Sequence, residues 1–146
     1  MVDSLIQLMG RIVTHIPETT DLSLITLKGH LIMEEELYKA LKTKAPNPEH
    51  IDKANLKFSQ LLQVAKAFYF EQHQSWVWGA ASKLNGIRND YSHSLVPENG
   101  GEKVTEFIEL VEAHAGSTKG DGFEHYRRAI AMVCAELHQL HTPKGA

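Results

Sequence analysis

The chain has 146 residues, a net charge of −3 and a single cysteine, Cys134. Of its residues, 42% are apolar and 23% are charged, which is typical of a globular protein. This length predicts a single domain over residues 1–146, and the acidic balance argues against a protein that coats nucleic acid through a broad basic face. The lone cysteine excludes an internal disulfide and fits a reducing cytoplasm, and we expect neither a signal peptide nor a membrane-spanning helix.

Two helices are predicted in the first third of the chain. Apolar residues at spacings of three and four, from Leu5 to Ile16, predict a first helix that Pro17 stops. Thr20 or Asp21 can cap a second helix, which ends before the prolines at 46 and 48. The stripe expected to face inward on this second helix consists of Leu24, Leu27, Leu31, Tyr38 and Leu41.

The same periodicity predicts further helices toward the C-terminus. A third covers residues 58–69, and a fourth carries the apolar stripe Val77, Ala80, Ala81, Leu84, Ile87 and Tyr91. A turn at residues 97–101 precedes a short helix around 104–111, and a polar loop over residues 116–122 leads to a last helix that ends before Pro143. Because no strand-like alternation is present, we predict an all-α fold, an up-and-down helical bundle of about five or six helices.

The chemistry of the chain is concentrated in Arg88-Asn89-Asp90-Tyr91-Ser92-His93, at the end of the predicted fourth helix. An imidazole exchanges protons near neutral pH, and a guanidinium grips phosphate or carboxylate through a fork of donors. At about 100° per residue, Asn89 and His93 share one face of a helix, whereas Arg88 and His93 differ by roughly 140°. A joint site therefore requires either a sweep of the long Arg88 side chain or the meeting of two chains.

The segment from Leu84 to His93 resembles the HEPN superfamily, whose hallmark is an arginine, a polar residue that is often asparagine, and a histidine a few positions later. The pattern is most similar to the branch that includes the mannitol operon repressor family, and the preceding helices, with Gly29–Glu34 and Phe58–Leu62, have a similar layout. The likeness covers about residues 20–95.

This resemblance implies a HEPN-like homodimer whose two motifs face one cleft, and it implies metal-independent RNA cleavage in a toxin–antitoxin system or in phage defence. Arg88 would stabilise charge on the phosphate, Asn89 would orient the substrate or the histidine, and His93 would act as general acid or base. No cofactor or metal is expected, and the partners would be RNA and an antitoxin or regulatory protein. The alternative is a non-catalytic regulatory module that binds a protein and acts in transcription regulation.

Other interpretations stay open. The hexad can be an ordinary helix end, with His93 favourably placed near the helix dipole and Arg88 paired with a carboxylate. A metal site built on Asp90 and His93 is disfavoured, because this chain lacks the Glu-x-x-His pairs of di-iron bundles. His138 and His141 have no third ligand nearby in sequence, so we expect them to be exposed.

Charged residues outside the hexad are expected mostly at the surface. Glu34, Glu35 and Glu36 are expected on a solvated face, although a buried hydrogen bond between His30 and Glu34 is an option. If the last helix packs beside the motif helix, cations from both can form a local patch for phosphate; otherwise Arg127 and Arg128 are expected to be solvated. The residues of that patch are Lys83, Arg88, Arg127 and Arg128.

Overall fold

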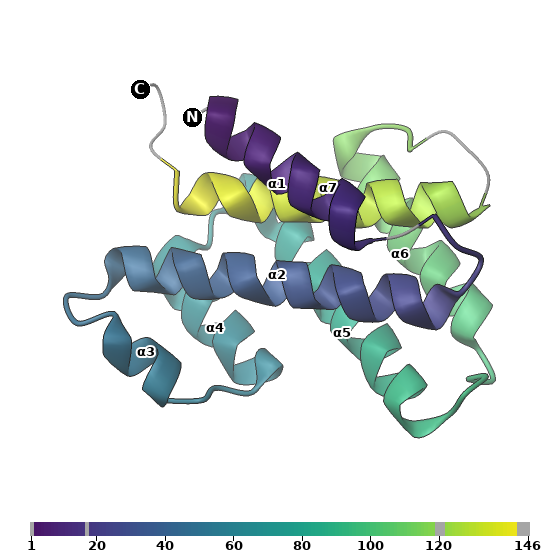
Figure 1. The fold of residues 1–146 in the computed structure, drawn as a ribbon, viewed down its shortest axis with the longest axis horizontal. Helices are drawn as coiled ribbons and strands as arrows, with labels where there is room; N and C mark the ends of the chain where they lie inside the picture. The colour runs from purple at the N-terminus through teal and green to yellow at the C-terminus, as the bar shows by residue number, and fades with distance from the viewer. Residues whose placement is uncertain (1, 17, 119–121, 143–146) are drawn as a thin grey trace.

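The computed structural model describes residues 2–16, 18–118 and 122–142, and within these ranges the chain is helical, with no strand (Figure 1). The all-α bundle predicted from the sequence is confirmed at this level. All six predicted helices are present, and a five-residue α3 and a short 3-10 turn (η1) add to them. The elements are α1 (Val2–His15), α2 (Leu22–Lys44), α3 (Glu49–Lys53), α4 (Phe58–Tyr69), η1 (Gln72–Gln74), α5 (Ser75–His93), α6 (Gly100–Ala115) and α7 (Gly122–Leu140).

Helix α2 forms the centre of the bundle. It packs against α4, α5 and α7, while α5 and α7 both pack against α6. Figure 1 shows α7 running alongside α2, α1 crossing near both, and α4 and α5 on the other side of α2. Asp21 caps this helix, because its Oδ1 accepts a hydrogen bond from the Leu24 amide at 3.2 Å.

Helices α2 and α7 pack closely against each other. A methyl group on Gly29 would lie 2.8 Å from Cγ2 of Ile130, so this position of α2 is open only to glycine at the present helix separation. One turn earlier, the hydroxyls of Thr26 and Tyr126 lie 2.6 Å apart, and both residues are fully buried. Burial raises the pKa of Tyr126, so this phenol remains a neutral hydrogen-bonding group.

The predicted apolar stripe of the fourth helix is correct, whereas that of the second is partly wrong. Val77, Leu84 and Ile87 of α5 are buried as expected, but Leu27 and Leu31 of α2 are 44% and 46% exposed. Helices pack around α2 on several sides, so its buried surface is wider than one stripe and includes polar groups. The buried set on α2 is Ile25, Thr26, Gly29, His30, Ile32, Met33, Glu36, Leu37, Ala40 and Leu41.

The predicted ends of several helices agree with the structure. Helix α1 ends at His15, and α2 ends at Lys44, before Pro46. Helix α6 (Gly100–Ala115) is longer than the short helix predicted around 104–111, begins within the predicted turn at 97–101, and is followed by Gly116 with a φ of 95°. The proline stops at 17 and 143 and residues 119–121 of the predicted polar loop lie outside the described residues. Within the described part of the chain, none of the helices combines the length and the hydropathy that crossing a membrane requires.

Candidate functional site

Arg88, Asn89 and His93 are exposed on the last turns of α5. The guanidinium of Arg88 donates to Asn89 Oδ1 at 3.4 Å, and among the described residues it forms no ion pair with a carboxylate. The helix-end interpretation, in which a surface carboxylate neutralises Arg88, is therefore not what the structure shows. A positive charge and an imidazole both remain available to a partner or ligand.

Arg88 and His93 line different depressions of the surface. Arg88 contributes to one formed with Ser23, Thr26 and Leu27 of α2, together with Tyr91 and Ser92. His93 contributes to another, which also involves Asp90, the residues 94–99 and Lys103. The structure thus keeps the two side chains apart within one chain, as the helical angle predicts. A site that uses both needs a second chain or a ligand long enough to span them.

Asp90, the carboxylate inside the motif, is paired with Lys103 of α6. This ion pair connects the end of α5 to the first turn of α6, across the loop that follows His93. Asp90 therefore does not neutralise Arg88. Its negative charge nevertheless stays close to His93.

The exposed Arg88 lies on the side of α5 next to α2, where its charge acts on two groups of α2. His30 Nε2 lies 3.1 Å from Oδ1 of Asn85, one turn before Arg88. Burial lowers the pKa of His30 to about 4; the bond to Asn85 opposes this shift, and the charge of Arg88 adds to it. Burial also raises the pKa of Glu34, against the influence of Arg88. The hydrogen bond between His30 and Glu34, one option that the sequence left open, is not formed, because His30 Nδ1 and Glu34 Oε2 are 3.9 Å apart.

Apolar side chains are exposed beside the motif. Leu27 lines the same depression as Arg88, and Leu31 follows it one turn later on α2. Just beyond the end of α5, Leu95 and Val96 are 95% and 85% exposed. Such residues flanking a charged motif are typical of a surface that another protein chain covers.

The cationic patch expected around Arg88 is not formed. Arg127 is mostly buried, contrary to expectation, and donates to the carbonyl of Ile16 at 2.7 Å and to Glu124. Arg128 donates to the carbonyl of Thr118. Lys83 faces Glu106 at 4.0 Å. The two arginines of α7 therefore contact the segments before α2 and after α6, and Lys83 faces α6, so none of the three joins Arg88.

A second polar cluster lies further along α2, and it corrects two expectations. Glu36 is completely buried, and its Oε2 accepts hydrogen bonds from His138 Nδ1, at 3.0 Å, and from His141 Nε2. Neither histidine is exposed, and a third potential ligand does meet them, from a residue 102 positions before His138. The sequence offered no signal for this contact, since spacing along the chain shows only the His138–His141 pair.

Charged groups around Glu36 keep it ionised. Burial raises the pKa of its carboxyl group, but hydrogen bonds from His141 and His138, with the charges of His141 and Lys39, outweigh burial and lower the pKa to about 2. Arg11 of α1 donates to Oε1 at 3.0 Å and also pairs with Glu35. On the other side, the Ser4 hydroxyl lies 2.6 Å from Nε2 of His138. Four segments of the chain therefore converge on this carboxylate.

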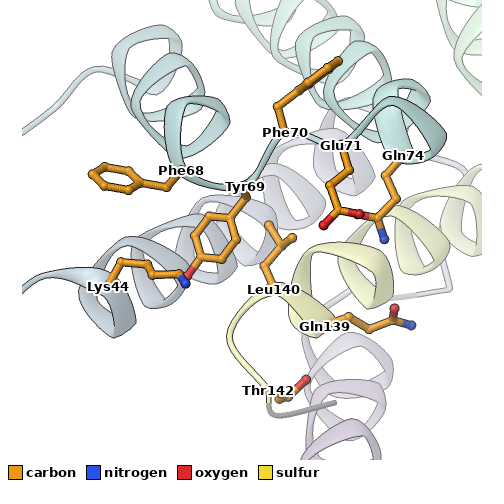
Figure 2. A pocket seen from close by; sticks show the side chains of 9 residues that line it. All are labelled: Lys44, Phe68, Tyr69, Phe70, Glu71, Gln74, Gln139, Leu140 and Thr142. Atoms are coloured by element: carbon orange, nitrogen blue, oxygen red, sulfur yellow. The ribbon is translucent and has the colours of Figure 1, made fainter. Parts of the chain in front are cut away.

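A third feature is a hollow of about 300 Å³ at the C-terminal end of α2 (Figure 2). Tyr69 lies between Lys44 and Leu140, and Phe68 and Phe70 point away to either side. The Tyr69 hydroxyl donates to the carbonyl of Ala40 at 2.6 Å. Because Ser23 near Arg88 and Lys44 are 21 residues apart on one helix, this hollow and the motif are separated by roughly 30 Å.

Comparisons with protein families, with characterised proteins and with solved structures found no match to this chain. The functional assignment therefore depends on the residues and their arrangement.

Proposed function

We propose that the chain is a HEPN-like endoribonuclease that acts as a homodimer and uses Arg88, Asn89 and His93 without a metal ion. The observation that carries the proposal is the exposed Leu27, followed one turn later by the exposed Leu31, beside an exposed arginine that has no carboxylate partner among the described residues. A second copy that covers this face would exclude water from the leucines and bring two motifs toward one cleft.

The dimer gives each residue a chemical role. One His93 would take the proton of an RNA 2′-hydroxyl while the other gives a proton to the leaving oxygen, so that the products carry a cyclic phosphate and a free hydroxyl. Arg88 would stabilise the charge that develops on the phosphate, and Asn89 would orient the phosphate or the imidazole. A single chain holds one of the two imidazoles, which is why the second copy matters.

The test is cleavage of mixed RNA by purified protein in the presence of EDTA. We expect cyclic-phosphate ends, and we expect His93→Ala and Arg88→Ala each to lower the rate by about 10²–10⁴-fold, the usual contribution of positioned acid–base and charged groups. His50→Ala is the matched control, because this histidine is exposed on α3. Circular dichroism of the same samples shows whether chelation or substitution has changed the fold.

The non-catalytic interaction module is the second candidate, and one observation favours it. Arg88 and His93 line different depressions, so one chain alone has no combined site. If the protein is folded and leaves RNA intact in EDTA, and if the substitutions at Arg88 and His93 instead abolish binding of a protein partner, this second function replaces the nuclease. Regulatory action in a toxin–antitoxin or transcription system would then depend on the same face.

A further inference from the structure

We propose that Glu36, His138 and His141 form a binding site for a transition-metal ion, most readily Zn²⁺, that joins the two terminal helices to α2. The three potential ligand atoms, one from each residue, all lie within 4.8 Å of one another. This inference is independent of the proposed nuclease, because the site is another part of the molecule. Thr26, near Arg88, and Glu36 are ten residues apart on α2, or roughly 15 Å.

The ligand set is suited to zinc. Two imidazoles and one carboxylate form the protein part of many zinc sites, with bonds of about 2.0–2.1 Å, so that neighbouring ligand atoms in a tetrahedron lie roughly 3.3 Å apart. Glu36 Oε2 and His138 Nδ1 are 3.0 Å apart, close to that spacing. The rings of His138 and His141 are nearly perpendicular, at 81°, with centroids 4.7 Å apart. The three ligand atoms lie within 4.8 Å of one another, so the two histidine nitrogens would have to approach each other by up to about 1.5 Å to surround one ion. Magnesium and calcium are disfavoured, because they prefer oxygen ligands.

The surrounding residues hold the ligands in place. Ser4 Oγ lies 2.6 Å from His138 Nε2, so a metal on Nδ1 leaves an Nε2–H that donates to this hydroxyl, the usual outer partner of a metal-bound histidine. Arg11 occupies the other oxygen of Glu36, which leaves Oε2 directed at the two histidines.

Burial indicates what the ion would do. Glu36 is 0% exposed, and the side chain of His141 is 10% exposed, so the ion would be enclosed by protein with little space for a substrate. Glu36 belongs to α2, His138 to the last turn of α7 and His141 to the segment after it, while Ser4 and Arg11 belong to α1. An ion here would link three helices, and we therefore assign it a structural role.

The test is metal binding by the full chain. After dialysis against EDTA, we expect the chain to take up one Zn²⁺, to give the visible absorption of tetrahedral Co²⁺ when loaded with cobalt, and to show no response to Mg²⁺. At a hundredfold excess over Kd, Zn²⁺ should raise Tm by about 5–10 °C, and EDTA should reverse the rise.

Variants separate a metal site from a set of hydrogen bonds. Loss of outer partners at metal sites weakens binding by about 10–100-fold, so His141→Ala, which removes a ligand, should weaken Zn²⁺ binding at least that much, and Ser4→Ala by about tenfold. His50→Ala should bind Zn²⁺ like the unaltered chain. A chain that shows no Zn²⁺ uptake and no Co²⁺ spectrum, or a His141→Ala variant that binds as tightly as the original, overturns the proposal. The cluster is then a hydrogen-bonded carboxylate alone.

Discussion

Leu27 of α2 and Arg88 of α5 line one depression, although they are 61 positions apart in the chain. The leucine is half-exposed, and the arginine has no carboxylate partner in the described part of the structure. Apolar area next to an unpaired cation gives a second chain both a hydrophobic contact and a site for a shared anion. We therefore expect two copies of the chain to meet at this face.

Leu27→Glu should convert the dimer to a monomer. The substitution replaces the apolar contact of the proposed interface with a carboxylate that must be desolvated, and this carboxylate would also neutralise Arg88, the neighbouring cation proposed to hold a shared anion. In the monomer position 27 is half-exposed, so the free energy of unfolding should change by about 0.5 kcal/mol or less. Sedimentation velocity measures the assembly state. Val13→Glu is the control, because Val13 is an exposed apolar residue of α1 and should leave the dimer intact. A monomeric unaltered chain, or a dimer that withstands Leu27→Glu, contradicts the interface.

His30 should make the fold sensitive to acid. Its pKa is about 4 in the folded chain against about 6.5 when unfolded, so the unfolded state binds the proton first. The contribution of the neutral His30 to the free energy of unfolding is then complete above pH 6.5. As the pH falls toward 4, the free energy of unfolding decreases by up to roughly 3 kcal/mol. Urea unfolding across this range should show the loss, and His30→Gln should reduce it, while His50→Gln should not.

Arg88 and His30 should also be coupled. Because the charge of Arg88 lowers the pKa of His30, Arg88→Gln should raise it. An NMR titration of the His30 ring measures this change directly. An unchanged titration in the variant would show that Arg88 does not lie over α2 as described.

Asp90 should oppose RNA binding. At a separation of about 8 Å in water-like surroundings, one like charge costs roughly 0.5 kcal/mol, so Asp90→Asn should raise kcat/KM for RNA by about two- to threefold at low salt. Lys103→Gln, which leaves Asp90 without its ion pair, should change kcat/KM in the opposite direction. Neither should alter stability by more than about 1 kcal/mol, as is usual for exposed pairs. A fall in kcat/KM on Asp90→Asn would assign the carboxylate a positive role in the site.

Two glycine substitutions test the packing of the bundle. Gly29→Ala should destabilise the chain by about 1–3 kcal/mol, because the new methyl group meets the buried Ile130 at 2.8 Å. Gly86→Ala on α5 meets no atom within 4 Å and should stabilise it by about 0.5–1 kcal/mol, the helix preference for alanine. Equal effects at the two positions, measured by urea unfolding, would contradict the close contact between α2 and α7.

The elements of the fold were accessible from the sequence, and much of its tertiary arrangement was not. The stripe of α5 was predicted correctly because one side of that helix faces the core, and periodicity detects such a face. Periodicity failed on α2, where Leu27 and Leu31 are exposed and Glu36 is buried. Helices surround α2 on several sides, so apolar and polar residues alike become buried, and only packing decides which.

Of the candidate sites, one could be found from the sequence and the other only from the structure. Arg88, Asn89 and His93 are close in sequence, so local chemistry and the helical angle were enough to single them out and to separate Arg88 from His93. The Glu36–His138–His141 cluster depends on the packing of α7 against α2, and no local pattern encodes a contact across 102 residues. His30 and Asn85 were likewise paired only by the packing of α2 against α5.

The most direct test of the shared cleft is the RNA cleavage rate of mixed dimers. Unaltered chains and His93→Ala chains are combined in equal amounts and allowed to exchange, and the rate per total protein is compared with that of the unaltered dimer. If one cleft needs both imidazoles, only dimers of two unaltered chains are active, and the rate should fall to about one quarter. A rate of about one half would mean that each chain cleaves alone, and would contradict the account.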